Sequence, residues 1–242
     1  SKGRVGESNV LQVQSDYNNT YTWGGKKHAV LTGVDYYDDD AKRNQNYANT
    51  TTRPTTTVGT PNDGAWVADG RAPVQWNTFT SRNLGLYFQD TVSLTDTLKL
   101  VGGLRYDNFK LDYRNNRNGQ ELSRSDNLVS PRLGLVYKPV NPLSLYASYS
   151  VSYLPYSGDQ FTTLDVTTQT LKPEKFTNYE IGAKWDVLPS LAFNAAIYQL
   201  DRTNTRATDP TNPALTVQTG STRSKGVELG LIQLGAVHAA GA

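Results

Sequence analysis

Apolar and polar residues alternate along much of the chain with a period of two. In residues 83–94, leucine, phenylalanine and valine occupy one parity, while glycine, tyrosine and polar residues occupy the other. The same pattern recurs in residues 98–107, 132–138, 143–151 and 179–187, and the second parity of most of these segments carries charge. A two-residue period places successive side chains on opposite faces of an extended strand. The pattern therefore predicts an all-β protein whose strands have one apolar and one polar face.

Short and long connections alternate between the predicted strands. Short turns rich in Gly, Pro, Asn or Asp are expected at residues 24–27, 95–97, 139–142 and 188–190. Longer polar loops are expected at residues 39–80, 112–126, 155–175 and 204–221. In a transmembrane β-barrel the short turns lie at the periplasmic rim and the longer loops lie outside the cell. Several segments also exceed the ~9–11 residues that a tilted strand needs to cross a bilayer. We therefore predict an antiparallel transmembrane β-barrel segment.

Tyrosine is frequent, with 15 residues, and many tyrosines fall near the ends of the alternating segments. Aromatic girdles at the two membrane interfaces would explain this placement. Ordinary cross-strand aromatic pairs would explain individual tyrosines equally well. The tyrosines assigned to the girdles are Tyr36, Tyr37, Tyr106, Tyr137, Tyr153 and Tyr179.

Composition excludes several other classes of protein. The mean hydropathy is −0.56 and no apolar run approaches ~18 residues, which excludes a membrane-spanning helix but not a barrel. A formal net charge of +2 gives no overall field for nucleic acid, and the absence of cysteine excludes disulfides and thiolate metal sites. His28 and His238 lie far apart in the chain, and no nucleophile elbow or phosphate-binding loop occurs. Enzyme activity is therefore not expected.

Six short motifs resemble successive barrel strands of TonB-dependent siderophore receptors. They lie on segments already predicted to be strands, between about Asn83 and Leu231, in the order in which the family has them. Before Asn83 the agreement is looser, with Lys27-His28 and Gly33-Val-Asp35 fitting a preceding strand. The motifs are Gly85-Leu-Tyr-Phe-Gln-Asp90, Gly103-Leu-Arg-Tyr-Asp107, Ser130-Pro-Arg-Leu-Gly-Leu-Val-Tyr-Lys-Pro139, Ser144-Leu-Tyr-Ala-Ser-Tyr-Ser150, Leu171-Lys-Pro-Glu174 with Tyr179-Glu-Ile-Gly182, and Gln218-Thr-Gly220 with Gly226-Val-Glu228.

The resemblance implies an outer-membrane receptor of a Gram-negative bacterium, with a barrel of ~22 strands closed around an N-terminal plug. We count about nine strands, so residues 1–234 are expected to form part of such a barrel, without the plug domain. Residues 235–242 do not alternate and are expected to be an atypical, truncated tail. The family takes up ferric siderophores, driven through the plug by the TonB energy-coupling complex. This chain alone is therefore not expected to transport its ligand.

The resemblance also suggests where a siderophore would bind, because the family holds its iron chelate in the extracellular loops and the upper lumen. Ferric catecholates are anionic, so Arg and Lys beside aromatic rings suit them, and a catecholate is weakly favoured here. No intrinsic cofactor and no metal site are predicted, and Asp38-Asp39-Asp40 lacks the spaced ligands of a calcium loop. The candidate ligand-binding residues are Arg53, Trp66, Arg71, Trp76, Arg114, Arg117, Arg124 and Tyr156.

Charged residues on the second parity are expected to face the lumen, where they pair across the inner wall or bind a plug. Pairing is the default, because lumen positions tolerate charge and lipid-facing positions do not. These residues are Lys99, Arg105, Asp107, Arg132, Glu180, Lys184, Asp186 and Glu228.

Two other functions share part of the pattern. A passive, porin-like outer-membrane channel would have the same strands and loops but no plug. A secreted β-sandwich binding module would also alternate, but its leucines would be buried between two stacked sheets. Detergent dependence of the purified chain would separate the barrel from the sandwich.

Overall fold

The computed structural model describes residues 3–46, 59, 73–155, 171–212, 216–218 and 220–233. They form one antiparallel nine-stranded sheet in the order β1-β2-β3-β4-β5-β6-β7-β8-β11, and β9 and β10 form a separate small sheet. Within those ranges no helix is long and apolar enough to cross a membrane. The strands are β1 (Gly3–Trp23), β2 (Lys26–Asn46), β3 (Pro73–Ser93), β4 (Leu98–Asn115), β5 (Gln120–Val140), β6 (Leu143–Leu154), β7 (Glu174–Leu188), β8 (Leu191–Thr203), β9 (Arg206–Thr208), β10 (Thr216–Gln218) and β11 (Ser221–Gln233).

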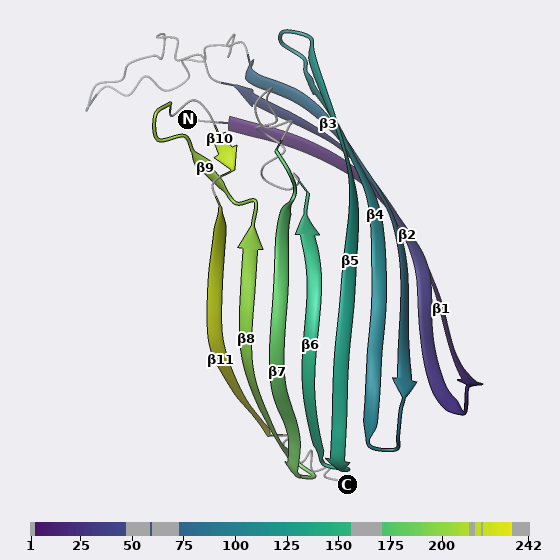
Figure 1. The fold of residues 1–242 in the computed structure, drawn as a ribbon. Coiled ribbons are helices and arrows are strands. Elements are labelled where there is room, and N and C mark those ends of the chain that lie inside the picture. The colour runs from purple at the N-terminus through teal and green to yellow at the C-terminus, as the bar shows by residue number, and fades with distance from the viewer. Residues whose placement is uncertain are drawn as a thin grey trace.

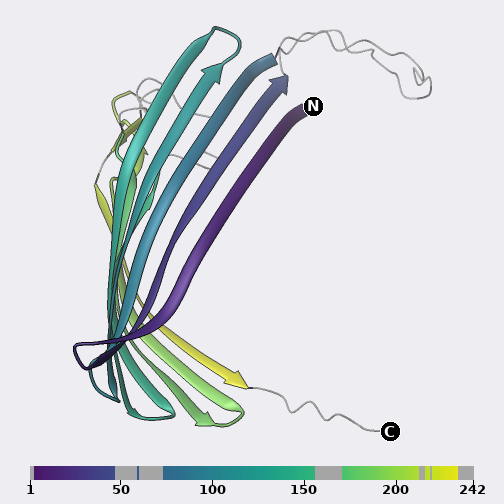
Figure 2. The same cartoon turned by 90° about the vertical axis from the view of Figure 1, so that its right-hand side faces the viewer.

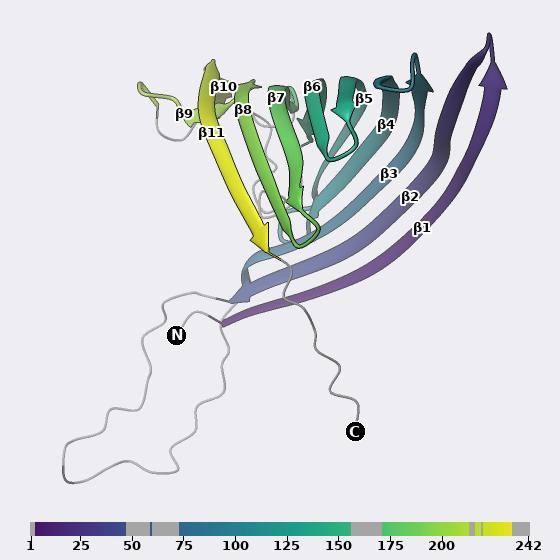
Figure 3. The ribbon, with the colours of Figure 1, turned by 90° about the horizontal axis from the view of Figure 1, so that it is seen from below.

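The nine-stranded sheet is curved into a trough, with β1 and β11 at its two open edges (Figure 3). Its strands are 12 to 21 residues long, whereas strands of soluble proteins usually have about 5–6 residues. Figure 2 shows how strongly the long N-terminal strands curve along their length. The predicted all-β class, the antiparallel order and the strand lengths are confirmed.

Four short turns lie at one end of the sheet, the lower end in Figure 1. β1 and β2 are joined by Gly24 and Gly25, whose φ angles of 57° and 71° require the left-handed region that glycine enters without strain. Two residues of this kind form the tight hairpin turn whose twist matches that of the strands. Residues 94–97, 141–142 and 189–190 make the other three turns. The four predicted short turns are confirmed.

The prediction for the opposite end was wrong for two loops. β4 continues to Asn115 and β5 begins at Gln120, so the expected loop of residues 112–126 is a hairpin with a connection of only four residues. β2 likewise continues to Asn46 and β3 begins at Pro73, well inside the expected loop of residues 39–80. Both segments are polar on the parity that carries leucine lower down, which gave them the composition of loops although they are strands.

The two faces of the sheet differ in chemistry. We call the face that carries Leu98, Leu100 and Leu104 the outer face, and the opposite face the inner face. Residues of β1 and β6 line one hollow on the inner face, so this face is the concave one. The outer face exposes a continuous set of large apolar side chains, which we call the apolar belt. Its members include Leu86, Phe88, Leu100, Leu104, Val129, Leu133, Leu135, Ile181, Ile197, Val227, Leu229 and Leu231.

The apolar belt has the height of a membrane's hydrocarbon core. On β4 it runs from Leu98 to Tyr106, and the outer positions above it are Asn108 and Lys110. Eight residue steps of about 3.3 Å cover about 26 Å along the strand, or about 20 Å across the membrane at a tilt near 40°. This is close to the apolar band of about 25 Å found on transmembrane barrels. Leucines exposed on one face of a single sheet also contradict the β-sandwich alternative.

Above the belt the chemistry of the two faces is exchanged. Phe79, Phe109, Leu111 and Tyr113 pack into a buried cluster on the inner face, with Leu111 fully buried. The outer positions at the same height are polar. The part of the wall that extends beyond the membrane therefore has a water-compatible outer surface and an apolar inner one.

The predicted aromatic girdles are confirmed for some tyrosines and wrong for two. Tyr106, Tyr137 and Tyr179 are exposed on the outer face near the ends of the apolar belt. Tyr37 instead has the inner-face parity and donates a hydrogen bond to Asp39, and Tyr153 lines the hollow on the inner face. Tyr37 lacks the outer parity, whereas Tyr153 shares the parity of Tyr149 but lines the hollow near the upper end of β6.

Inner-face tyrosines lie directly over glycines of the next strand. Tyr146 faces Gly182 across β6 and β7, and Tyr198 faces Gly226 across β8 and β11. A Cβ added to Gly182 would lie 2.5 Å from the ring of Tyr146, and one on Gly226 would lie 2.6 Å from the ring of Tyr198. These glycines therefore give the rings room to lie flat against the wall.

Candidate functional site: the inner wall of the sheet

A hydrogen-bonded network joins four strands on the inner wall. Arg105 of β4 donates from Nη1 to Oδ2 of Asp35 on β2 at 2.6 Å, and from Nε to Oδ2 of Asp107 at 2.8 Å. Tyr87 of β3 donates to Asp16 of β1, and the Arg105 guanidinium lies 5.6 Å from the centre of the Tyr87 ring. Charge-assisted pairs of this kind are the strong hydrogen bonds of proteins. The network ties Asp16, Asp35 and Asp107 to neighbours in the wall.

Gly85 makes this network possible. It lies opposite Asp107 in the β3–β4 register, and a Cβ at this position would lie 2.7 Å from Oδ1 of Asp35. The guanidinium of Arg105 can therefore cross β3 to reach β2 only because position 85 has no side chain. The sequence motif that begins with Gly85 thus has a packing role in the wall.

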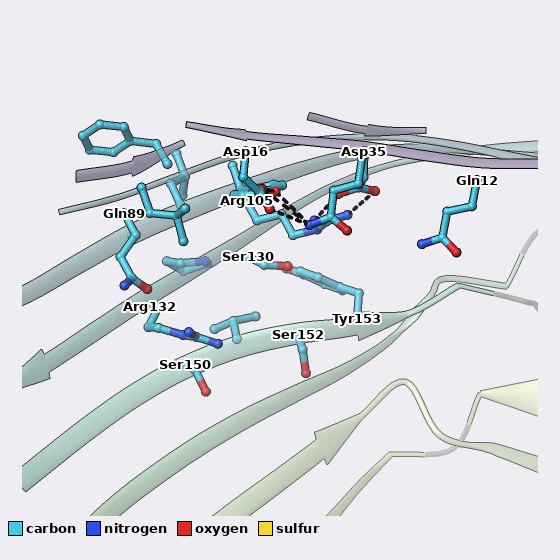
Figure 4. A pocket seen from close by; sticks show the side chains of 18 residues that line it. Gln12, Asp16, Asp35, Gln89, Arg105, Ser130, Arg132, Ser150, Ser152 and Tyr153 are labelled. Carbon is cyan, nitrogen blue, oxygen red and sulfur yellow. Dashed lines mark hydrogen bonds and ion pairs between the residues drawn. The ribbon is translucent and has the colours of Figure 1, made fainter. Parts of the chain in front are cut away.

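Below and beside the network lies a hollow of about 790 Å³ on the inner wall. Figure 4 shows Arg132 with Ser150, Ser130 and Gln89 around it, and the Asp16, Asp35 and Arg105 network to the other side. The lining therefore combines hydroxyl and amide groups with two guanidinium groups. Ligand sites typically have volumes of about 300–1,000 Å³, so the hollow is large enough for a small molecule.

The charged residues predicted to face the lumen divide into paired and unpaired ones. Arg105 and Asp107 are paired, and Glu180 accepts a hydrogen bond from Tyr146 at 2.6 Å. Lys184 lies 5.9 Å from the centre of the Tyr146 ring. Arg132, by contrast, has no hydrogen-bond or ion-pair partner among the residues that the structure describes. Pairing across the wall, the expected default, is thus confirmed for part of the set.

A second site lies higher on the inner wall, beside the buried aromatic cluster. Arg124 of β5 pairs with Asp126 through Nε at 2.6 Å and lies opposite Leu111 of the cluster. Its side chain is only 5% exposed, and its Nη1 is buried without a hydrogen-bond partner in the described part of the chain. Burial in the same cluster raises the pKa of Tyr113. A buried arginine, with one donor that has no partner among the described residues, thus lies beside a cluster that contains aromatic rings, above the level of the membrane.

The structure places four of the eight predicted ligand-binding residues, and it does not bring them together. Arg124 is on the inner face, whereas Arg114 is on the outer face and lies 3.5 Å from Glu121. Trp76, with the same parity as Arg114, is half-exposed on β3, and Arg117 lies in the turn between β4 and β5. Arg53, Trp66, Arg71 and Tyr156 lie outside the described residues.

The hollow contains residues that the sequence analysis had not singled out. Gln12, Gln14 and Asp16 come from β1, where they alternate with Leu11, Val13 and Tyr17 of the outer face. This alternation is the sequence signal that could have marked them as lumen-facing. The alternation of β5 did identify Arg132.

No group of three or more His, Asp or Glu side chains that could hold a metal ion occurs in the described ranges. Asp38, Asp39 and Asp40 alternate between the two faces of β2. Asp38 pairs with Arg82 at 3.1 Å, and Asp40 accepts a hydrogen bond from Thr80. Asp38 and Asp40 thus have separate partners on the outer face, while Asp39 on the inner face accepts hydrogen bonds from Ser8 and Tyr37.

The exposed apolar belt on the convex face, the charged inner wall and the short turns at one rim define the wall of a transmembrane β-barrel. Residues 2–240 match the family model described as TonB dependent receptor-like, beta-barrel. The chain belongs to this family, whose members are receptors of the outer membrane of Gram-negative bacteria.

Relatives and solved structures agree with this membership. The probable TonB-dependent receptor BfrD of Bordetella pertussis is 36% identical over 159 residues, covering 61% of this chain and 21% of that protein. The catecholate siderophore receptor Fiu of Escherichia coli K12 is 26% identical over 230 residues, covering 81% of this chain and 29% of that protein. The crystal structure of the siderophore receptor PiuA from Acinetobacter baumannii superposes with a TM-score of 0.79 at 23% identity, covering 94% of this chain and 36% of that one.

The chain therefore spans between about a fifth and about a third of the length of the proteins that it matches. Its nine strands correspond to part of a larger barrel, as the sequence predicts.

Proposed function

We propose that this chain forms part of the wall of an outer-membrane receptor for the TonB-dependent uptake of ferric siderophores. The observation that carries the proposal is family membership over nearly the whole chain, together with relatives that are named as siderophore receptors. The chain contributes lipid-facing surface on one side and a polar wall to the ligand's path on the other. It carries out no chemical step on the ligand.

The inner wall supports this role physically. A charged, hydroxyl-rich wall with a hollow of about 790 Å³ suits the passage of a polar chelate better than that of an apolar molecule. Above it, Arg124, whose Nη1 has no hydrogen-bond partner in the described part of the chain, lies beside the cluster of Phe79, Phe109 and Tyr113. Guanidinium and aromatic groups together suit an anionic, aromatic chelate, so we favour a ferric catecholate.

The remaining candidate contacts belong to the same proposal. Arg53, Trp66, Arg71 and Tyr156 would meet the ligand from the extracellular side, together with Arg117. Trp76 and Arg114 face away from the inner wall, so they would contribute only through a ligand that reaches over the rim. Energy would come from the TonB complex, through a plug region outside this wall.

Uptake of iron-55 chelates by the receptor, as its cell of origin produces it, tests the proposal. A ferric tris-catecholate and a ferric trihydroxamate are offered to energised cells and to cells without a proton gradient. We expect energy-dependent uptake, with the catecholate preferred. Uptake that continues without the gradient would indicate a passive channel, and negligible binding of both chelates would contradict the receptor assignment.

A further inference from the structure

Arg132 differs from the other basic residue that lines the hollow. Arg105 holds two carboxylates, those of Asp35 and Asp107, in ion pairs of 2.6 Å or less. Arg132 lies on the same wall but has no carboxylate or other hydrogen-bond partner among the described residues. Its side chain is exposed on the inner face, near Ser130 and Ser150 (Figure 4). The hollow therefore contains one satisfied guanidinium and one available guanidinium.

The carboxylates around the hollow are already occupied. Asp35 and Asp107 are held by Arg105, and Asp16 accepts hydrogen bonds from Tyr87 and from Gln14. A ligand in the hollow would thus find its free charge-assisted donors on Arg132, with serine hydroxyls beside it. Arg132 favours an anion at its own position, because no carboxylate of the described residues takes up its guanidinium donors, whereas the nearby carboxylates already accept hydrogen bonds.

Arg132 also lies at the depth of the apolar belt. Its neighbours in sequence, Pro131 and Leu133, are on the outer face within the apolar belt, which on β5 runs from Val129 to Tyr137. Arg124 lies eight residues higher on the same strand, a distance of about 27 Å at 3.4 Å per residue. Arg132 is therefore inside the membrane span, on the way from the extracellular Arg124 region to the periplasmic turns.

We propose that Arg132, with Ser130, Ser150 and Gln89, forms a second anion-binding subsite within the lumen, which an anionic iron chelate occupies during passage and after it leaves the extracellular region. The inference rests on the proposed function, since it names a further position of the same ligand. It requires no new chemistry, only successive binding. The subsite affects the rate at which the chelate passes through the lumen and contributes little to its binding at the cell surface.

The test compares Arg132→Gln, Arg132→Lys and the control Lys138→Gln, each in the receptor as its cell of origin produces it. Lys138 is an exposed lysine of β5 beside the turn to β6 and is not among the residues that line the hollow, so its loss removes one positive charge without changing the hollow. Uptake of a trianionic ferric tris-catecholate and of an uncharged ferric trihydroxamate is measured in energised cells. Surface binding is measured in cells without a proton gradient, and receptor amounts are compared by immunoblot.

We expect Arg132→Gln to slow catecholate uptake about tenfold, which corresponds to about 1.4 kcal/mol, while surface binding changes less than about twofold. Arg132→Lys should retain most of the uptake, and Lys138→Gln and hydroxamate uptake should stay near wild type. Equal loss of both chelates, or normal catecholate uptake by Arg132→Gln, would overturn the subsite while leaving the receptor function intact. Leakage of a large antibiotic through Arg132→Gln without any chelate would also overturn it, because Arg132 would then be holding a luminal polypeptide segment. A wild-type receptor that transports neither chelate would contradict the proposed function itself.

Discussion

A single arginine substitution on β5 tests the membrane boundary that the two faces define. Leu133 lies at the centre of the apolar belt on this strand, midway between Val129 and Tyr137, and is 55% exposed on the outer face. Ser125 has the same outer parity eight residues higher and lies above the belt. Leu133→Arg would place a guanidinium about 10 Å from either edge of the hydrocarbon, whereas Ser125→Arg would place it among polar groups.

The expected magnitudes follow from this depth. Arginine at the midplane of a transmembrane barrel costs about 2–4 kcal/mol, and arginine near the interface costs about 0–1 kcal/mol. Leu133→Arg should therefore lower the free energy of unfolding by about 2–4 kcal/mol, and Ser125→Arg by less than about 1 kcal/mol. Leu133→Ala controls for the loss of the leucine itself.

Denaturant titration of the receptor in phospholipid vesicles, followed by tryptophan fluorescence, measures these differences. The reasoning would be refuted if Leu133→Arg stayed within about 0.5 kcal/mol of wild type, the range of ordinary surface substitutions. It would equally be refuted if Ser125→Arg were the more destabilising change, because the hydrocarbon would then lie higher on the wall.

Two further predictions concern packing and charge. Gly182→Ala should lower the free energy of unfolding of the receptor by about 1–3 kcal/mol, because the added Cβ would meet the ring of Tyr146. Much of this loss should disappear in a Tyr146→Ala background. A double-mutant cycle by denaturant titration measures the coupling between the two positions. Arg223, above the belt on the outer face, donates to Asp201 at 2.6 Å and lowers the pKa of that carboxyl below 3.8. The stability from this pair is present above pH 3.8 and is lost as the pH falls through the lowered pKa, so Arg223→Gln should return the carboxyl's titration midpoint in NMR toward 3.8; an unchanged midpoint would show that the pair does not form.

The parts of the fold that the sequence predicted correctly are those where each strand has one consistently apolar parity. From Leu98 to Tyr106, and again from Val129 to Tyr137, the leucines fall on the lipid side and the other parity falls on the lumen side. Register then follows, because a slip by one residue would move every leucine to the wrong face. The faces of Arg105 and Arg132 could therefore be predicted from the sequence.

The sequence could not show which lumen residues meet. Arg105 and Asp35 are 70 residues apart and lie on strands separated by β3, so their contact depends on the register of three strands and on the missing side chain at Gly85. Arg132 could be placed on the inner face in advance, but its lack of a partner among the described residues could not be predicted. Pairing in the wall is a property of the assembled sheet.

The loops predicted at residues 39–80 and 112–126 failed for a related reason. Above the membrane the outer face meets water, so polar residues replace the leucines on that parity, and the apolar residues move to the inner face as Phe109 and Leu111. If the parity that carries the leucines of the belt is followed into the segments above the membrane, it contains polar residues, so these segments look like loops. Alternation continues across the boundary, but its sense is reversed.

This reversal also orders the path along the inner wall. The upper wall is apolar and aromatic, with Arg124 the buried cation beside the cluster, while the wall within the membrane span is polar and carries the exposed Arg132. A catecholate chelate has both aromatic edges and negative charge, so the upper region suits its rings and the lower region suits its charge. Under the proposed function, the guanidinium of Arg132, about 27 Å further along the strand, gives the chelate a next binding position after it has left the first region. The same reversal of parity that misled the loop prediction thus separates two chemically different environments along one strand.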